Sequence, residues 1–148
     1  MVMIRKIRKE DKSEYVAMAK DFYSSDAVCR NIPEKYFDNT FHELMRSDNY
    51  ADAYIIEFKN IIAGYALLAK TFSQEAGGMT LWIDEIYIKP EYRGHGLGHE
   101  FFQFLKRNIQ SDIKRVRLEV DGSNEKAISL YQKIGFENLP YCQMIKDF

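Results

Sequence analysis

The feature that most constrains the fold is a glycine-rich segment between an apolar run and an amphipathic helix. The segment reads Arg93-Gly94-His95-Gly96-Leu97-Gly98, and the apolar run before it spans residues 81–88. After it, apolar residues recur every four positions, at Leu97, Phe101, Leu105 and Ile109. Glycines let the backbone turn several N–H groups toward one point, and a helix N-terminus adds positive charge. With Arg93 beside it, this strand–turn–helix unit predicts a phosphate-binding loop.

Two common phosphate loops do not fit this segment. The P-loop requires lysine and a hydroxyl residue after its last glycine, whereas Gly98 is followed by His99 and Glu100. The dinucleotide fingerprint requires a third glycine where His99 stands, and it belongs near the first βαβ unit. A tight turn without any ligand remains the alternative.

A second segment, residues 116–136, also predicts a strand followed by a helix. Val116, Leu118 and Val120 alternate with charged residues, as in a half-buried strand. Turn-forming residues 121–124 follow, with Ser123 or Asn124 as the helix cap. The expected helix carries apolar residues at helical spacing and ends at a glycine with positive φ; these residues are Ala127, Leu130, Tyr131, Ile134 and Gly135.

Together, the two segments resemble the GNAT family of N-acetyltransferases. Residues 93–98 match the family's acetyl-CoA loop, Arg/Gln-x-x-Gly-x-Gly/Ala. The pattern Asn124-x-x-Ala127-x-x-Leu130-Tyr131-x-x-x-Gly135-Phe136 matches its second core motif. The resemblance covers residues 81–136, and the first half of the chain agrees only in the order of its elements.

The resemblance implies an α/β acyl-CoA N-acyltransferase fold, with a mixed, mostly antiparallel sheet and helices on both faces. It implies an enzyme that moves an acetyl group from acetyl-CoA to a primary amine by direct attack in a ternary complex, without a metal. The expected acceptor is a small cationic amine such as a polyamine. A peptide or protein amine, and a non-catalytic CoA-binding regulatory domain, are the alternatives. The expected cofactor-binding residues are the loop Arg93, Gly94, His95, Gly96, Leu97 and Gly98, the backbone of Ile86, Tyr87 and Ile88, and Asn124, Ala127 and Tyr131.

Three residues are the catalytic candidates. Tyr131 matches the family tyrosine that hydrogen-bonds the coenzyme sulfur and acts as general acid, although it could be an ordinary buried aromatic. Asp84 and Glu85 are adjacent carboxylates in an apolar strand, where a raised pKa would suit a general base. Because consecutive strand residues face opposite sides, we expect the two carboxylates not to share one role. Attraction of a cationic amine, or a merely exposed strand face, are the other interpretations.

Metal binding is not expected. His95 and His99 lie four residues apart, but only Glu100 could act as a further ligand beside them. We expect His95 to contribute only its backbone. The acceptor site is expected to be walled by residues 22–50, which combine aromatics with carboxylates; they include Tyr23, Tyr36, Phe37, Phe41, Asp26, Glu34 and Asp38.

Composition sets wider limits. The 148 residues are expected to form one domain, 1–148, and the net charge of −1 argues against nucleic acid as a partner. Only two cysteines, Cys29 and Cys142, are present, which favours a reducing, cytoplasmic setting. We expect no signal peptide and no membrane contact, because charge begins at Arg5 and no apolar run is long enough to span a bilayer. A homodimer is compatible with the resemblance.

The remaining elements complete the order βααβββαβαβ. We expect a strand at 3–8, a helix at 11–22 opened by a capping box from Asp11 to Glu14, and a second helix after Pro33. On that second helix Phe37, Phe41, Leu44 and Met45 are expected to share one face. Strands at 53–58 and 61–70 form a hairpin at Lys59-Asn60, and a last strand is expected at 142–145.

Overall fold

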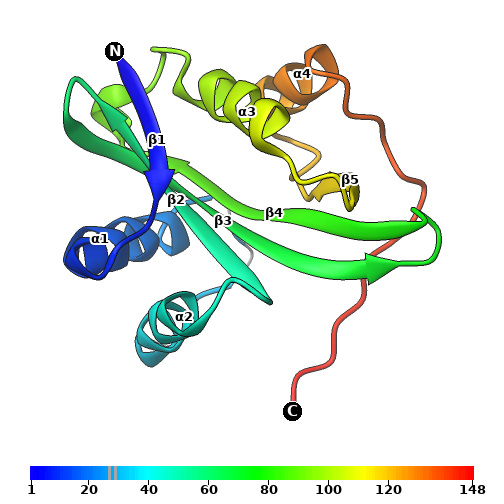
Figure 1. Cartoon of the computed structure of the whole chain (residues 1–148), viewed down its shortest axis with the longest axis horizontal. Helices are drawn as coiled ribbons and strands as arrows, with labels where there is room; N and C mark the ends of the chain where they lie inside the picture. Colours follow the sequence, from blue (N-terminus) through cyan, green and yellow to red (C-terminus); the bar gives the residue numbers. More distant parts are fainter. Residues whose placement is uncertain (27, 29) are drawn as a thin grey trace.

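A computed structural model gives the fold and describes residues 1–26, 28 and 30–148 (Figure 1). The strands are β1 (Val2–Lys6), β2 (Ala51–Phe58), β3 (Ile61–Ser73), β4 (Gly78–Ile88) and β5 (Ile113–Leu118). The α-helices are α1 (Lys12–Tyr23), α2 (Lys35–Arg46), α3 (Leu97–Asn108) and α4 (Glu125–Lys133). Two short 3-10 turns, η1 (Lys9–Asp11) and η2 (Pro90–Tyr92), precede α1 and the glycine-rich loop.

The strands form one mixed sheet in the order β1-β2-β3-β4-β5. β1 to β4 pair antiparallel, and β5 pairs parallel to β4. The hairpin between β2 and β3 turns at Lys59 and Asn60, whose φ angles are 52° and 65°. Positive φ at both central residues matches the twist of the flanking strands, so the predicted hairpin is confirmed.

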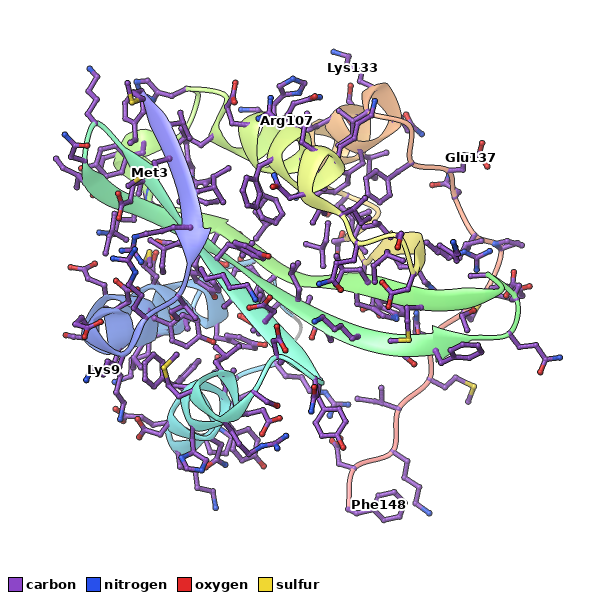
Figure 2. All side chains as sticks on the ribbon, viewed as in Figure 1. Met3, Lys9, Arg107, Lys133, Glu137 and Phe148 are labelled. Atoms are coloured by element: carbon purple, nitrogen blue, oxygen red, sulfur yellow. The ribbon has the colours of Figure 1, made fainter. Side chains whose placement is uncertain are left out.

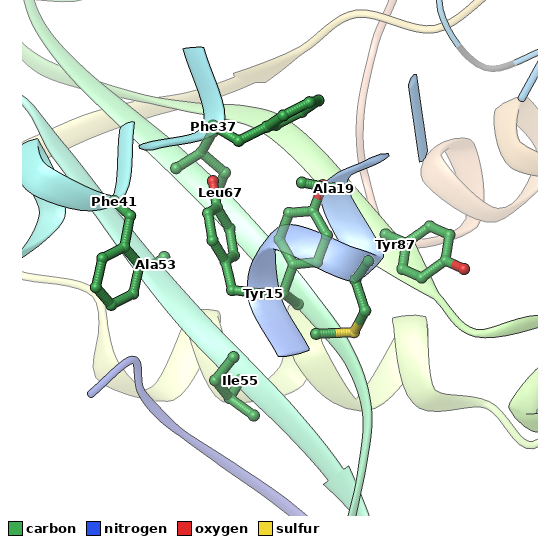
Figure 3. Close-up of a cluster of buried hydrophobic side chains, with 10 residues drawn as sticks. Tyr15, Ala19, Phe37, Phe41, Ala53, Ile55, Leu67 and Tyr87 are labelled. Atoms are coloured by element: carbon green, nitrogen blue, oxygen red, sulfur yellow. The ribbon is translucent and has the colours of Figure 1, made fainter. Parts of the chain in front are cut away.

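Helices cover both faces of the sheet, as the sequence predicted. α1 and α2 bury aromatic and aliphatic side chains against one face, where Tyr15 and Phe41 pack on Ala53 and Ile55 of β2 (Figure 3). α3 and α4 lie on the other face (Figure 1), and Phe101 is fully buried there. The mixed sheet with a helical layer on each side is the expected acyltransferase architecture.

One irregularity in β4 shapes the site. In the pairing of β3 with β4, Leu67 lies opposite Glu85 and the next residue, Leu68, lies opposite Ile83. Asp84 therefore has no partner on β3 and forms a β-bulge in β4. On the other side, the parallel pairing of β4 with β5 reaches Ile83 opposite Leu118 and goes no further. A bulge bends a strand and raises its local twist, which separates β4 from β5 beyond this point.

Two local expectations were wrong. Asp11 precedes α1 but makes no side-chain cap. Instead its carboxylate accepts hydrogen bonds from Arg5 at 2.8 and 2.9 Å, and one of its oxygens also accepts from the backbone N–H of Arg8 at 2.7 Å. Because the carboxylate is bound to Arg5 of β1, it does not cap α1.

On α2, Phe37 and Phe41 are buried and Leu44 packs against them, but Met45 is 40% exposed because it lies off that face.

The predicted last strand at 142–145 is also wrong. Residues 134–148 form no helix or strand, so the element order ends at α4. Part of the segment lines a cavity together with β5, and its end at Phe148 lies away from the sheet (Figure 2). Alternating apolar residues make a strand only when a partner takes their backbone hydrogen bonds, and in this structure the segment pairs with no neighbour.

Two further observations concern the cysteines and the helices. Cys142 is exposed with a free thiol, and Cys29 lies outside the described residues. Within the described part of the chain, every helix is too short or too polar to cross a bilayer.

Candidate active site

The separation of β4 from β5 leaves one edge of β4 open over residues 84–88. Ile86, Tyr87 and Ile88 pair with β3 on one side only. Their other edge faces the gap, where the carbonyl of Ile88 accepts a hydrogen bond from the Arg93 side chain at 2.9 Å. An open strand edge is a template for pairing with an extended amide-bearing chain.

The glycine-rich loop lies directly beyond this open edge. Gly94 and Gly96 adopt φ angles of 78° and 75°, a left-handed conformation that glycine reaches at little cost. An added Cβ at either glycine would meet nothing within 4 Å, so both face open space. Gly96 is the N-cap of α3 and supplies no side-chain cap, so among the described residues no capping side chain takes the N–H groups of the first turn, which suits them to an anion.

The charged side chains of this loop fold back onto the protein. The Arg93 guanidinium lies over the ring of Tyr87 at 5.9 Å, while Nδ1 of His95 lies 3.1 Å from the backbone carbonyls of Tyr92 and Arg93. The His95 ring also contacts that of Phe58, with 5.0 Å between centroids. His95 therefore presents its backbone rather than its ring, and among the described residues no group of three potential metal ligands forms.

Glu85 is buried and held by two phenols. It is 7% exposed, and its two carboxylate oxygens accept hydrogen bonds from Tyr65 at 2.8 Å and from Tyr23 at 3.3 Å. Burial raises the pKa of Glu85, the two hydroxyls oppose that effect, and the nearby Asp84 adds to it. The net direction is upward because desolvation is the largest of these effects.

Asp84 lines the same cavity as Glu85. This cavity of about 370 Å³ is bounded by both carboxylates and by side chains of α1, α2 and β3, including Tyr15, Phe37 and Leu67. The expectation that the two carboxylates face opposite sides of the strand is therefore wrong, whereas their having separate roles stays a prediction. A regular strand would have separated them, but Asp84 is the bulge residue and departs from the alternation.

The two carboxylates differ in their surroundings. Asp84 is exposed and has no hydrogen-bond partner among the described residues, unlike Glu85. Partial desolvation, and then the carboxylate of Glu119, raise the pKa of Asp84. Because solvent reaches Asp84, water screens these effects more than it does at Glu85.

Tyr131 stands apart from the carboxylates. On α4 it packs edge-on against Phe102 at 5.7 Å and contacts Phe136 at 5.9 Å. It lines a different cavity of about 680 Å³, between β5 and the segment that follows α4. Burial raises its pKa, so the phenol keeps its proton at neutral pH. The structure thus joins Asp84 to Glu85 but leaves Tyr131 beside β5.

The remaining motif residues have clear local roles. Asn124 caps α4, its side-chain oxygen accepting from the N–H of Ala127 at 3.2 Å, which leaves the amide NH₂ free to donate elsewhere. Gly135 ends the helix with φ of 102°, as predicted. Gly98 lies close to α4, since a Cβ there would be 3.9 Å from Leu130.

Only some of the residues expected to wall the acceptor site line the carboxylate cavity, and one residue at that cavity's carboxylates was missed. Tyr23 and Phe37 line the carboxylate cavity. Glu34 and Asp38 instead form surface ion pairs with Lys20 and Lys12. The hydrogen bond from Tyr65 to Glu85 was not anticipated, because a tyrosine inside an apolar strand is usually a core residue. The only sequence signal was its hydroxyl group, which needs a hydrogen-bond partner when it is buried.

Comparisons with known proteins identify the family. The model of the Acetyltransferase (GNAT) family matches residues 7–136. A Bacillus subtilis (strain 168) protein named for N-acetylation of alanine in ribosomal protein bS18 is 35% identical over 68% of this chain and 62% of its own length. The thialysine N-epsilon-acetyltransferase of Bos taurus is 30% identical over 53% of this chain and 46% of its own length. The chain therefore spans less than two thirds of these two relatives.

The fold has close counterparts among solved structures. The crystal structure of a possible acetyltransferase from Clostridium difficile 630 superposes with a TM-score of 0.83, at 16% identity, over 100% of this chain and 98% of that one. At this identity the likeness establishes the fold alone. Because the family model covers most of the chain, the protein belongs to the GNAT family of acetyltransferases.

Proposed function

We propose that the protein is an acetyl-CoA-dependent N-acetyltransferase acting on a primary amine of a small cationic molecule. The observation that carries this proposal is the open edge of β4, which runs from the carboxylates Asp84 and Glu85 to the glycine-rich loop. An extended thioester cosubstrate anchored at the loop would therefore end beside two potential proton acceptors.

The residues fit acetyl-CoA in three places. The free N–H groups of Gly94 to Gly98 and the α3 N-terminus suit a pyrophosphate. The open backbone of Ile86, Tyr87 and Ile88 suits the amides of the pantetheine arm, as an added strand would. The free amide of Asn124 is a further donor, and the small Ala127 leaves room beside it. Acetyl-CoA would supply an acetyl group activated as a thioester.

The carboxylate cavity suits an ammonium group. Glu85 provides buried negative charge, and the rings of Tyr15, Tyr23 and Phe37 provide aromatic faces and edges around it. A cationic amine would replace part of its hydration by these contacts. The pKa values of Asp84 and Glu85 are raised, which makes each carboxylate a better proton acceptor than an ordinary one.

The chain's own residues would take part in the proton transfers that accompany acetyl transfer. The amine first loses a proton to the carboxylate, directly or through water. Its nitrogen lone pair then attacks the carbonyl carbon, which a backbone N–H near Ile86 polarises. The new C–N bond forms as the C–S bond breaks. The nitrogen, positively charged after the attack, gives its second proton to water or to the second carboxylate, and the thiolate takes one proton from the hydroxyl of Tyr131 or from water.

The relatives support the reaction class and leave the acceptor open. One is named for an alanine of a ribosomal protein and another for thialysine, a small amine. A cavity of about 370 Å³ favours the small molecule.

The test is an acetylation assay with purified protein and acetyl-CoA. Free thiol release would be followed with a panel of polyamines, amino sugars, amino acids and peptides bearing free N-termini. We expect turnover of at least one small cationic amine and none without acceptor. If only peptides were acetylated, the acceptor would be a peptide or protein amine and the small-molecule acceptor would be excluded. Tight CoA binding without turnover of any amine would indicate a non-catalytic CoA-binding domain.

A further inference from the structure

Helix α1 is bound to the end of β4 by three side-chain hydrogen bonds. Alternate residues along a strand point to the same face, and from residue 85 onward three of them each contact one side chain of α1. The pairs are Glu85 with Tyr23, Tyr87 with Asp21, and Lys89 with Glu14. The position of α1 over the sheet therefore depends on polar contacts with the strand as well as on apolar packing.

The middle pair binds the last turn of α1. The hydroxyl of Tyr87, a residue that is 5% exposed, donates to Oδ2 of Asp21. Burial, and then Asp21, raise the pKa of Tyr87 to about 12, so the phenol keeps the proton that it donates. A hydrogen bond to an ionised acceptor is stronger than one between neutral groups. The ring of Phe22 also meets that of Tyr87 edge-on, with 6.5 Å between centroids.

This turn ends at Tyr23, which lines the acceptor cavity. The ring of Tyr23 packs edge-on against Phe37, and its hydroxyl donates to Glu85 at 3.3 Å. That distance is long for an O–H donor, whose usual value is about 2.8 Å, so the bond by itself holds Tyr23 weakly. Asp21 lies two residues earlier on the same turn. Its strong bond to Tyr87 is thus placed to keep Tyr23 within reach of Glu85.

The other polar contacts of α1 cannot take over this role. The bond from Lys89 to Glu14 lies at the first turn, seven residues or about 10 Å of helix away from Asp21. Lys20, on the last turn, pairs with Glu34, which is exposed and precedes α2. That ion pair joins two surface segments and makes no contact with β4.

We propose that Asp21, through Tyr87, is a positioning residue that holds Tyr23 against Glu85 and thereby keeps the acceptor cavity in the shape that binds the amine. The inference rests on the proposed function and assigns a role to a contact outside the cavity, since neither Asp21 nor Tyr87 is among the described residues that line it. The ring of Tyr87 also carries the Arg93 guanidinium, but that contact does not require the hydroxyl. Loss of the bond should therefore affect the acceptor and spare the cofactor.

Three single variants test the proposal. Asp21→Ala removes the carboxylate, and Tyr87→Phe removes only the donor hydroxyl and keeps the ring under Arg93. Glu14→Ala is the matched control, because it breaks the hydrogen bond at the other end of the same helix. Steady-state kinetics with the amine found in the acetylation assay would give KM and kcat, and calorimetry would give CoA affinity. The NMR signal of the labelled Tyr23 ring, assigned by its loss in Tyr23→Phe, would report its position without turnover.

We expect the acceptor KM to rise roughly tenfold in Asp21→Ala and in Tyr87→Phe, while kcat and CoA affinity change less than about twofold. The double variant should be no worse than either single one, because both changes break the same bond. The Tyr23 ring signal should move toward that of an exposed tyrosine in both variants. In Glu14→Ala, the KM and the ring signal should stay at their wild-type values.

An unmoved Tyr23 signal, a wild-type acceptor KM, or an equal effect of Glu14→Ala would each overturn the proposal. A parallel loss of CoA affinity would also overturn it, because Tyr87 would then act on the glycine-rich loop. If Tyr23 moved in both variants of a protein that acetylates no amine, the positioning role would stand and only the proposed acetyl transfer would be refuted.

Discussion

The hydroxyl of Tyr65 donates a hydrogen bond to Glu85, with 2.8 Å between the two oxygens, and both side chains are buried. With Tyr23 on the second carboxylate oxygen, Glu85 is held in one orientation at the base of its cavity. Asp84, which has no such partners, is free to approach a substrate. The pair therefore combines a fixed charge with an accessible proton acceptor, and this division leads to the first two predictions.

Neutralising each carboxylate separately should impair the reaction with the acceptor amine and leave CoA binding unchanged. In Asp84→Asn and Glu85→Gln we expect CoA affinity, measured by calorimetry, to stay near the wild-type value. At least one variant should lose about 10²-fold in kcat or lose the acid limb of its pH–rate profile. That limb should lie above the range of an ordinary carboxylate, because the pKa of each group is raised. Wild-type rates and profiles in both variants would make these residues structural.

Glu85→Gln should also change how stability depends on pH. The folded protein holds the Glu85 proton more tightly than the unfolded chain, whose glutamate pKa is ~4.3. The contribution of Glu85 to the free energy of unfolding is therefore greatest below the unfolded-state pKa. It decreases as the pH rises through the higher pKa that Glu85 has in the folded protein. Glutamine removes the buried charge, so Tm at pH 7 should rise relative to wild type while Tm at pH 4 changes little. A lower Tm at pH 7 would show that the phenol hydrogen bonds outweigh desolvation.

Gly96→Val should weaken CoA binding. Gly96 has φ of 75°, which a β-branched residue adopts poorly, and its Cβ would occupy the open space at the α3 N-terminus. We expect at least tenfold lower affinity, about 1.4 kcal/mol. Gly122→Ala, at an equally open glycine without positive φ, is the matched control and should bind normally. Unchanged affinity in a folded Gly96→Val protein would exclude the loop as the phosphate site.

Tyr131→Phe should slow turnover without weakening cofactor binding. The ring contacts with Phe102 and Phe136 would survive, and only the hydroxyl would be lost. We expect kcat to fall roughly 10²-fold with little change in acetyl-CoA affinity. Tyr50→Phe, at a tyrosine that is 69% exposed on the surface, controls for loss of a hydroxyl elsewhere. Near-normal kcat would mean that water protonates the thiolate.

Asp11→Asn should destabilise the protein and leave the site intact. Asp11 is buried and accepts a two-point contact from Arg5, which holds the pKa of Asp11 below its usual range. Removing the charge leaves Arg5 paired only with Glu57, and we expect a loss of ~3 kcal/mol at pH 7. Because the folded pKa is lowered, the difference should shrink as the pH falls below ~4. Denaturant titration at both pH values measures it.

The elements with strong local signals could be predicted from the sequence. Lys59-Asn60 set the hairpin, and Gly135 ended α4, because each requires a backbone conformation that few residues adopt. The stripe Leu97, Phe101 and Leu105 located α3, and all three are buried. Ile109, the fourth expected member, is 39% exposed because α3 ends at Asn108. These signals are local, so neighbouring residues contain all the necessary information.

What depends on distant partners could not be predicted. The bulge at Asp84 shows itself only in the register against β3, and no residue type marks it. The role of Tyr65 depends on Glu85, twenty residues away. The segment around Met144 has strand-like composition, yet Met144 is 93% exposed because the sheet offers it no pairing here. In each case a tertiary contact, or its lack, decided the outcome.

The open edge of β4 also has a fixed length. From Asp84 to Ile88 the strand advances about 13 Å, a length fixed by the rise of an extended backbone. That rigid interval would set how far the acyl carbon of a bound thioester lies from its phosphate anchor. Changes in α1 or α2 could then alter the acceptor without disturbing where the acyl group arrives. A single residue inserted between the bulge and the loop would lengthen the distance from the loop to the carboxylates and misplace the reacting carbon.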